Sequence, residues 1–305
     1  MACNVIVFLR MNLPLPLLLA PVVILTGSGC RSDRHANQEW LEWRLKRHES
    51  VAGTNGWTTI VARHWLKEGP NTAGSSPTNQ LVLPPGAPAM IGTFSREGRV
   101  VRFDPASGIT ATIEGRPIAT TQLSSDASNA PTRLLIGSLT FVVIERGERI
   151  GVRVRDPDAP TRKQFRGLKC FPYDERWTIA GRFESFPSRQ TMRVDDITGG
   201  KQDLLSPGVV RFEYGGKVIR LQVVEEPGEE DLFVIFRDQT AGASTYGSGR
   251  FLYVPRPGPD GRVVIDFNRA YTPPCAFTKF ATCPLPPRQN WLPFAVPAGE
   301  LNPGH

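Results

Sequence analysis

The chain has 305 residues and few of the groups that most often build enzyme centres. None of its four histidines has a second histidine or a cysteine at the spacing of zinc ligands, which argues against a zinc site of the usual kinds. The sequence has no Gly-x-Ser-x-Gly turn to present a nucleophilic serine, and no Gly-x4-Gly-Lys-Ser/Thr or Gly-x-Gly-x-x-Gly loop to hold phosphates. We therefore expect neither a bound metal nor a cofactor.

Blocks of like charge are also missing. The formal net charge is +7, but acidic and basic residues are mixed along the chain, as they are through residues 146–158. A surface that binds nucleic acid needs clustered cations to neutralise phosphates. No nucleic-acid partner is expected.

The apolar stretch near the N-terminus, Leu13–Leu25, is too short to remain as a membrane anchor. It has 13 residues and contains three prolines, whereas a spanning helix needs about 20 residues. A stretch of this length after a basic residue is typical of an export signal, and we predict such a signal over residues 1–29. Translation can begin at Met1 or Met11, although a start at Met11 removes the basic residue.

Small residues precede Cys30 and resemble a bacterial lipobox, in which the cysteine is lipidated and becomes the new N-terminus. The pattern departs at Gly27, where such motifs usually carry leucine. We predict an extracytoplasmic lipoprotein anchored to the envelope membrane through Cys30. The alternative is a soluble secreted or periplasmic protein.

Export would place the remaining cysteines in an oxidising compartment where disulfides persist. Cys275 and Cys283 are eight residues apart in a looped, proline-rich segment, and we predict a disulfide between them. Cys170 is then left over and is expected to be a small buried hydrophobic residue. The alternative is that Cys275 is a nucleophile, which needs a nearby base or cation to lower its pKa.

The remaining pattern predicts a mainly β protein. The 29 glycines and 28 prolines favour turns over long helices. One amphipathic helix is expected over Asn37–Glu49, with Trp40, Leu41, Trp43 and Leu45 on its apolar face. Its tryptophans are expected to pack on the β body or, alternatively, to lie at a membrane surface. Beyond it, short apolar runs between turns predict strands, and the clearest hairpin joins Val209–Tyr214 to Lys217–Val224 through Gly215-Gly216.

The pattern divides into four parts. After the signal, residues 30–55 hold the anchor cysteine, a polar spacer and the helix. Residues 56–155 and 156–305 are expected to form two sandwich-like or barrel-like modules, because a proline-rich break falls at Asp156–Arg162.

The irregular segment Asp266–Glu300 concentrates polar side chains after a strand, where functional groups often lie. Asp266, Asp238 and Cys275 are the catalytic candidates. The candidate binding residues are Arg250, Tyr246, Thr240, Asn268, Tyr271, Asn290 and Glu300. One interpretation is a pocket in which Arg250 clamps a carboxylate or phosphate; the other is a buried network that holds the tail on the sheet.

Several motifs resemble the domain-of-unknown-function 1684 family. They are Gly56-Trp57 through Trp65-Leu66, Asp238-Gln239-Thr240 with Thr245-Tyr246, Gly249-Arg250-Phe251, and the block Asp266–Glu300. The block differs from the residues that are usual in the family at Thr272 and Phe280. The resemblance implies no activity, because the family has none established.

The first module also resembles the forkhead-associated β-sandwich, which binds phosphothreonine. The resemblance lies in Ala73–Leu83 and Thr112–Ile118. Ser75 stands where that module has its arginine, and Ala87–Gly92 replaces its Ser-Arg-x-x-His stretch. A phosphate needs such charged donors, so phosphothreonine binding is not expected.

These observations favour an envelope protein that binds a small anionic ligand or a protein partner through its second module. The alternative is a hydrolase-like enzyme that uses Asp266, Asp238, Arg250 and Cys275. A purely structural envelope protein is a third interpretation.

Overall fold

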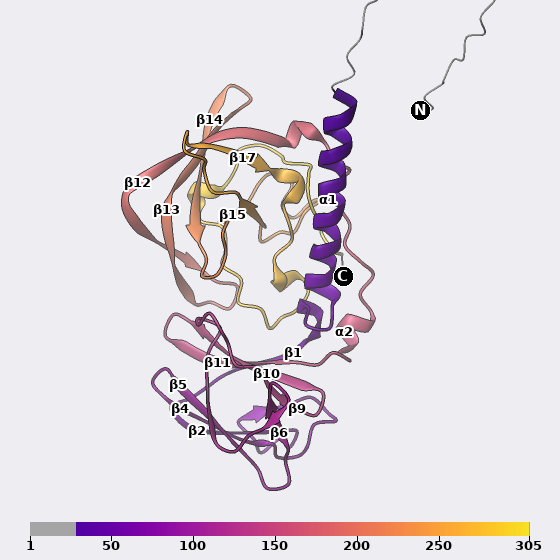
Figure 1. The fold of residues 1–305 in the computed structure, drawn as a ribbon, viewed down its shortest axis with the longest axis vertical. Helices are drawn as coiled ribbons and strands as arrows, with labels where there is room; N and C mark the ends of the chain where they lie inside the picture. The colour runs from indigo at the N-terminus through magenta and orange to yellow at the C-terminus, as the bar shows by residue number, and fades with distance from the viewer. Residues whose placement is uncertain (1–28, 305) are drawn as a thin grey trace, which may run out of the picture.

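The computed structural model describes the backbone of residues 29–304 and the side chains from Ala36 onward. The structure is mainly β, as the sequence predicts, with one long N-terminal helix. The predicted signal lies outside the described residues except for Gly29, and so does the side chain of Cys30. Figure 1 shows two β bodies stacked end to end, with the helix running along one of them toward the other.

Helix α1 (Gly29–Ala52) begins eight residues before the predicted one. Trp40, Arg47 and Val51 are buried, whereas Leu41 and Leu45, which we expected on the apolar face, are 47% and 72% exposed. The predicted helix was therefore right and its predicted packing face was wrong for the leucines. Within residues 29–304, no helix is both long enough and apolar enough to cross a membrane.

The N-terminal body is a sandwich of two sheets. One has the order β1-β11-β10-β9-β6-β7 and the other β3-β2-β4-β5-β8. The strands are β1 (Ile60–Trp65), β2 (Gly69–Gly74), β3 (Leu81–Val82), β4 (Gly92–Glu97), β5 (Val100–Pro105), β6 (Ala111–Ile113), β7 (Arg116–Pro117), β8 (Thr121–Leu123), β9 (Leu134–Ile136), β10 (Leu139–Arg146) and β11 (Arg149–Arg155). Apolar side chains from both sheets, such as Phe94, Phe103 and Phe141, meet in one buried core. We call this body the N-module.

The second body, the C-module, is one antiparallel sheet in the order β16-β15-β14-β13-β12-β17. Short helix α2 (Pro160–Lys163) precedes it. The strands are β12 (Thr178–Asp195), β13 (Lys201–Tyr214), β14 (Lys217–Glu225), β15 (Leu232–Phe236), β16 (Arg250–Val254) and β17 (Arg262–Asp266). The predicted hairpin is confirmed: β13 and β14 pair across Gly215-Gly216, whose positive φ values suit a tight hairpin turn.

The irregular tail after β17 covers both faces of this sheet. All five residues of β15 are buried, because Val234 packs in a core with Phe267 and Val296 on one side, while Ile235 packs with Ala281 on the other. The tail keeps short 3-10 turns at Phe267–Arg269, Pro274–Ala276 and Arg288–Asn290. The segment that looked like an active site from its composition therefore completes the core of the C-module.

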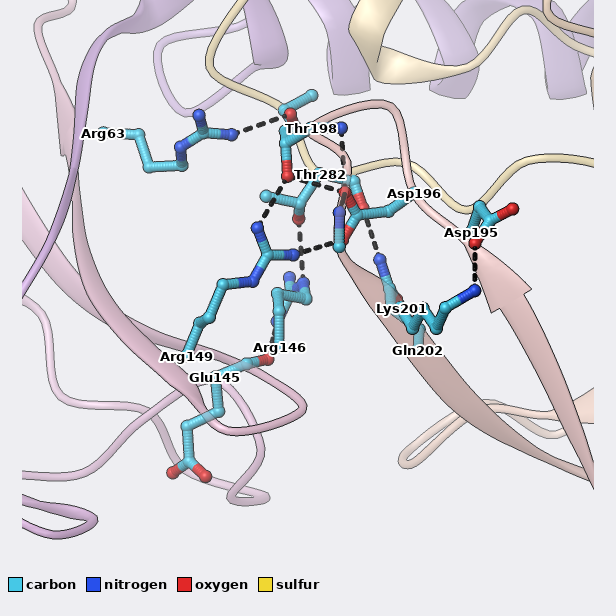
Figure 2. A network of polar contacts seen from close by, with 12 residues as sticks. Arg63, Glu145, Arg146, Arg149, Asp195, Asp196, Thr198, Lys201, Gln202 and Thr282 are labelled. Atoms are coloured by element: carbon cyan, nitrogen blue, oxygen red, sulfur yellow. Dashed lines mark hydrogen bonds and ion pairs between the residues drawn. The ribbon is translucent and has the colours of Figure 1, made fainter.

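Arginines of the N-module join the two bodies. In Figure 2, Arg149 reaches the turn between β12 and β13, where it pairs with Asp196 and donates to Thr198 Oγ1 at 2.9 Å. Arg146 Nε donates to Thr282 Oγ1 of the tail, also at 2.9 Å. Burial alone would raise the pKa of Asp196, but hydrogen bonds from Thr198 and Gly200 and the charge of Arg149 hold it below its usual value. The contact is a polar one that fixes the orientation of the modules.

Candidate functional site

The structure separates the predicted site residues into five groups. The first is a buried network around Arg250, at the start of β16. The side chains of Arg250 and Asp238 are both 1% exposed and form an ion pair of 3.2 Å. Arg250 also donates to the carbonyls of Val296, at 2.9 Å, and Ala298. The guanidinium of Arg250 is occupied by Asp238 and by the backbone of the tail, which favours the buried-network interpretation over the ligand clamp.

Asp238 is equally committed. Its carboxylate accepts from Val296 N at 2.6 Å and from Thr240 Oγ1 at 2.8 Å, and Thr240 in turn hydrogen-bonds Thr245. These contacts satisfy a buried charge, as an interior charge requires. Asp238 and Thr240 thus belong to the structural network and present nothing to a ligand.

Asparagine side chains pin the tail in a second group. Asn290 is 0% exposed, and it accepts from Gln222 N at 2.8 Å while donating to Gln222 O and Ile235 O. Asn268 makes the same kind of paired contact with Asp174, both at 3.0 Å. Each side-chain amide supplies hydrogen bonds to backbone groups that lack a backbone partner because the neighbouring chain is irregular. The network interpretation holds for both residues.

The predicted disulfide is absent from the structure. Cys275 and Cys283 are free thiols, and Cys275 N donates to Cys283 Sγ at 3.2 Å. Hydrogen bonds from Cys283 and Tyr246 lower the pKa of Cys275 against the opposing effect of burial. Burial raises the pKa of Cys283 well above its usual value, and burial and then Cys275 raise that of Tyr246 to about 12. The looped segment brings the two sulfurs together, as the spacing predicts, but as an unsymmetrical pair of thiols.

Alkylation tests this assignment. We expect iodoacetamide to modify Cys275 first, with a rate that rises with pH and reaches half of its plateau at a lower pH than an ordinary cysteine thiol. Half-buried Cys170, which we expected to be fully buried, should react slowly, because burial and then Glu300 raise its pKa to about 11. Tyr246→Phe should slow Cys275 by removing one donor. Peptide mass spectrometry measures each rate, and a pair that reacts only after reduction would restore the disulfide.

Asp266 and Tyr271 lie in a different setting, a cavity of about 470 Å³ between α1 and the C-module. Asp266, at the end of β17, accepts from Asn268 N at 3.1 Å and Nδ2 at 2.9 Å, and its second oxygen pairs with Arg269 Nε at 3.1 Å. Tyr271 stacks on Tyr253 with ring centres 6.1 Å apart. These are the two predicted residues that reach a space large enough for a ligand.

Most of the cavity wall was missed from the sequence. Helix α1 contributes Ala36, Glu39 and Trp43, and the loop before β15 contributes Glu229 and Asp231. The other lining residues are Tyr173, Thr178, Tyr253, Pro255, Val264 and Arg269. One sequence signal pointed to this wall, the tryptophan pattern of the helix. That pattern predicts that the helix contacts the β body, but it does not say which residues it contacts.

Glu300 holds α1 to this wall from behind. It is 1% exposed and accepts from Arg47 Nε at 2.9 Å and from Thr272 N at 2.8 Å. Arg47 Nη2 donates to Thr272 O at 2.7 Å, and its guanidinium lies 4.6 Å from the centre of the Tyr271 ring. Glu300 is therefore a structural latch between α1 and the tail, and its predicted part in ligand binding stays a prediction.

The catalytic constellation does not assemble. Asp238 is bound to Arg250, Asp266 to Asn268 and Arg269, and Cys275 to Cys283 and Tyr246. Among the side chains described, from Ala36 to Gly304, no three of His, Cys, Asp or Glu are grouped so that they could hold a metal ion. The cavity is lined by aromatic side chains and carboxylates.

The clearest similarity to known proteins lies in the C-module. Residues 163–301 match the family described as "Protein of unknown function (DUF1684)". A solution structure of an uncharacterized protein of Haloarcula marismortui is 31% identical, with a TM-score of 0.39, over 46% of this chain and 78% of its own. No curated protein matches the chain.

Two forkhead-associated domains are also similar to part of the chain. The FhaA domain, crystallised with the intracellular domain of another protein, is 16% identical over 30% of this chain and 96% of its own, with a TM-score of 0.21. A domain from work on phosphothreonine-dependent interactions is 18% identical over 32% and 96%, with a TM-score of 0.22. We draw no function from these two similarities.

Proposed function

We propose that this chain, whose residues 163–301 belong to the DUF1684 family, is an exported envelope protein that binds a small ligand in the cavity between α1 and the C-module. The observation that carries the proposal is the cavity itself. Its volume is about 470 Å³, and four aromatic rings line it together with carboxylates. Sites for small molecules are hollows of roughly 300–1,000 Å³ with mainly apolar walls and a few polar groups.

The anionic ligand expected from the sequence is no longer the favoured one. Arg250 was its expected clamp, and that side chain is 1% exposed and lies outside the cavity lining. Arg269 is the one guanidinium in the lining, and it pairs with Glu39 at 3.2 Å and with Asp266 at 3.1 Å. A ligand carboxylate or phosphate would have to displace both acidic partners.

Attachment to the membrane through Cys30 remains part of the proposal. Cys30 and Ala36 are six residues apart on α1, which is about 9 Å along a helix axis. A lipid on Cys30 would therefore place the cavity close to the membrane surface. The mass of the protein recovered from membranes checks this: a lipidated N-terminal cysteine is expected, and a soluble protein beginning elsewhere would contradict it.

A blocking substitution tests the binding site. Ala36→Trp should fill the cavity from α1 and weaken any small molecule found in a ligand-observed NMR screen by at least about tenfold. Gln38→Trp is the matched control, because Gln38 is exposed on the same helix and outside the lining. The proposal fails if the molecules that bind are held equally by the blocked protein.

A further inference from the structure

The cavity lining has a net negative charge, whereas the whole chain has a net positive charge. Four carboxylates line it, from Glu39, Glu229, Asp231 and Asp266, against the single guanidinium of Arg269. Arg269 is shared between Glu39 and Asp266, so its charge is already balanced inside the wall. The chain as a whole carries a formal charge of +7. A net negative hollow on a basic protein raises the local concentration of cations and repels anions.

The aromatic wall suits the same kind of ligand. Tyr253 donates its hydroxyl to Glu226 Oε2 at 2.5 Å, and a phenol that donates to a carboxylate presents a more electron-rich ring. Cations bind to the faces of such rings within about 6 Å of the centre. Arg47 already makes this contact with Tyr271. Among the described residues, no protein cation lies over Trp43, Tyr173 or Tyr253.

The acidic side chains are spread around the wall. Glu39 projects from α1, Glu229 and Asp231 from the loop before β15, and Asp266 from the end of β17. A divalent metal ion needs several oxygens converging on one point, and no such group exists among the side chains of residues 36–304. Separated carboxylates around aromatic rings match a larger cation with spread charge.

We propose that the cavity binds a small organic cation, a substituted ammonium group, on the faces of Trp43 and Tyr173, beside Tyr253 and within the ring of carboxylates. This inference rests on the proposed function, because it assigns a ligand class to the same cavity. The ammonium group can belong to a free solute or to a lipid headgroup, since the two share this chemistry.

Choline and 3,3-dimethylbutan-1-ol form the decisive pair of probes, because they have nearly the same shape and differ in charge. We expect calorimetry at constant ionic strength to show choline binding about tenfold more tightly than the neutral alcohol. Choline should compete with phosphatidylcholine vesicles, and not with phosphatidylglycerol vesicles, if the natural source is a headgroup. With a free solute, neither vesicle competes.

Charge variants separate this proposal from the proposed function. Glu229→Gln with Asp231→Asn should weaken the binding of choline about fivefold and leave the binding of the neutral alcohol unchanged. The matched control, Glu213→Gln with Asp260→Asn, removes two exposed carboxylates outside the cavity lining and should change neither. Equal affinity for both probes, no binding of either, or an unchanged double variant would overturn the cation proposal. If Ala36→Trp leaves choline binding intact, the cavity itself is the wrong site.

Discussion

Replacement of Arg250 by methionine is expected to lower the free energy of unfolding by about 3–5 kcal/mol. Methionine removes the charge and leaves Asp238, whose side chain is 1% exposed, as an uncompensated anion in the interior. The carbonyls of Val296 and Ala298 lose their donor at the same time. Urea unfolding followed by tryptophan fluorescence measures the loss.

Two comparisons make this result specific. Asp238→Leu with Arg250→Met should recover part of the loss, because removing both charges leaves no buried ion without a partner. Arg193→Met breaks a pair with Asp203 whose side chains are 66% and 49% exposed, and it should cost far less, because solvent screens an exposed pair. A loss below about 1 kcal/mol in Arg250→Met would show that water reaches this network.

Burial lowers the pKa of Arg250, although Asp238 and Glu300 act in the opposite direction. The charged form is therefore less favoured in the fold than in water, and the pair adds little net stability compared with an apolar core. The role of the pair is to set the position of the tail relative to β16. Arg250 donates hydrogen bonds to Val296 and Ala298 of the tail, and these bonds fix one register. A hydrophobic contact would not fix a single register.

The fold was predictable where the signal is local. Alternating apolar residues and two glycines specify the hairpin of β13 and β14, because strand period and turn chemistry agree there. The concentration of polar groups in the tail was also a sound signal. It marks a segment that lacks ladder partners and satisfies its backbone with side chains such as Asn290.

The cavity could not be predicted, because its wall is assembled from segments far apart in sequence. Trp43 on α1 and Tyr253 on β16 are 210 positions apart and meet only after α1 docks. The docking face itself is chosen by Trp40, whose Nε1 donates to Asn268 O at 3.0 Å, and by Arg47. Apolar periodicity pointed to Leu41 and Leu45 instead, since it does not register polar contacts.

Glu300→Gln is expected to release α1 from the C-module at a cost of about 3 kcal/mol. The amide keeps the size of the side chain but leaves Arg47, which is 8% exposed, without its counter-charge. We expect α1 to open locally while the sheet stays intact, because the strands of the C-module keep their own pairing. Hydrogen exchange should then become faster over residues 36–52 than over β13 and β14.

The same substitution should abolish ligand binding, because Glu39 and Trp43 leave the cavity wall when α1 opens. Glu42→Gln is the control, since Glu42 is exposed on the same helix and, among the described residues, hydrogen-bonds only Gln38; it should change neither exchange nor binding. Arg47→Met together with Glu300→Gln should restore part of the protection, because no buried cation is then left alone. If Glu300→Gln exchanges like the parent protein, the latch is not what holds α1, and the contact of Trp40 with Asn268 must carry that role.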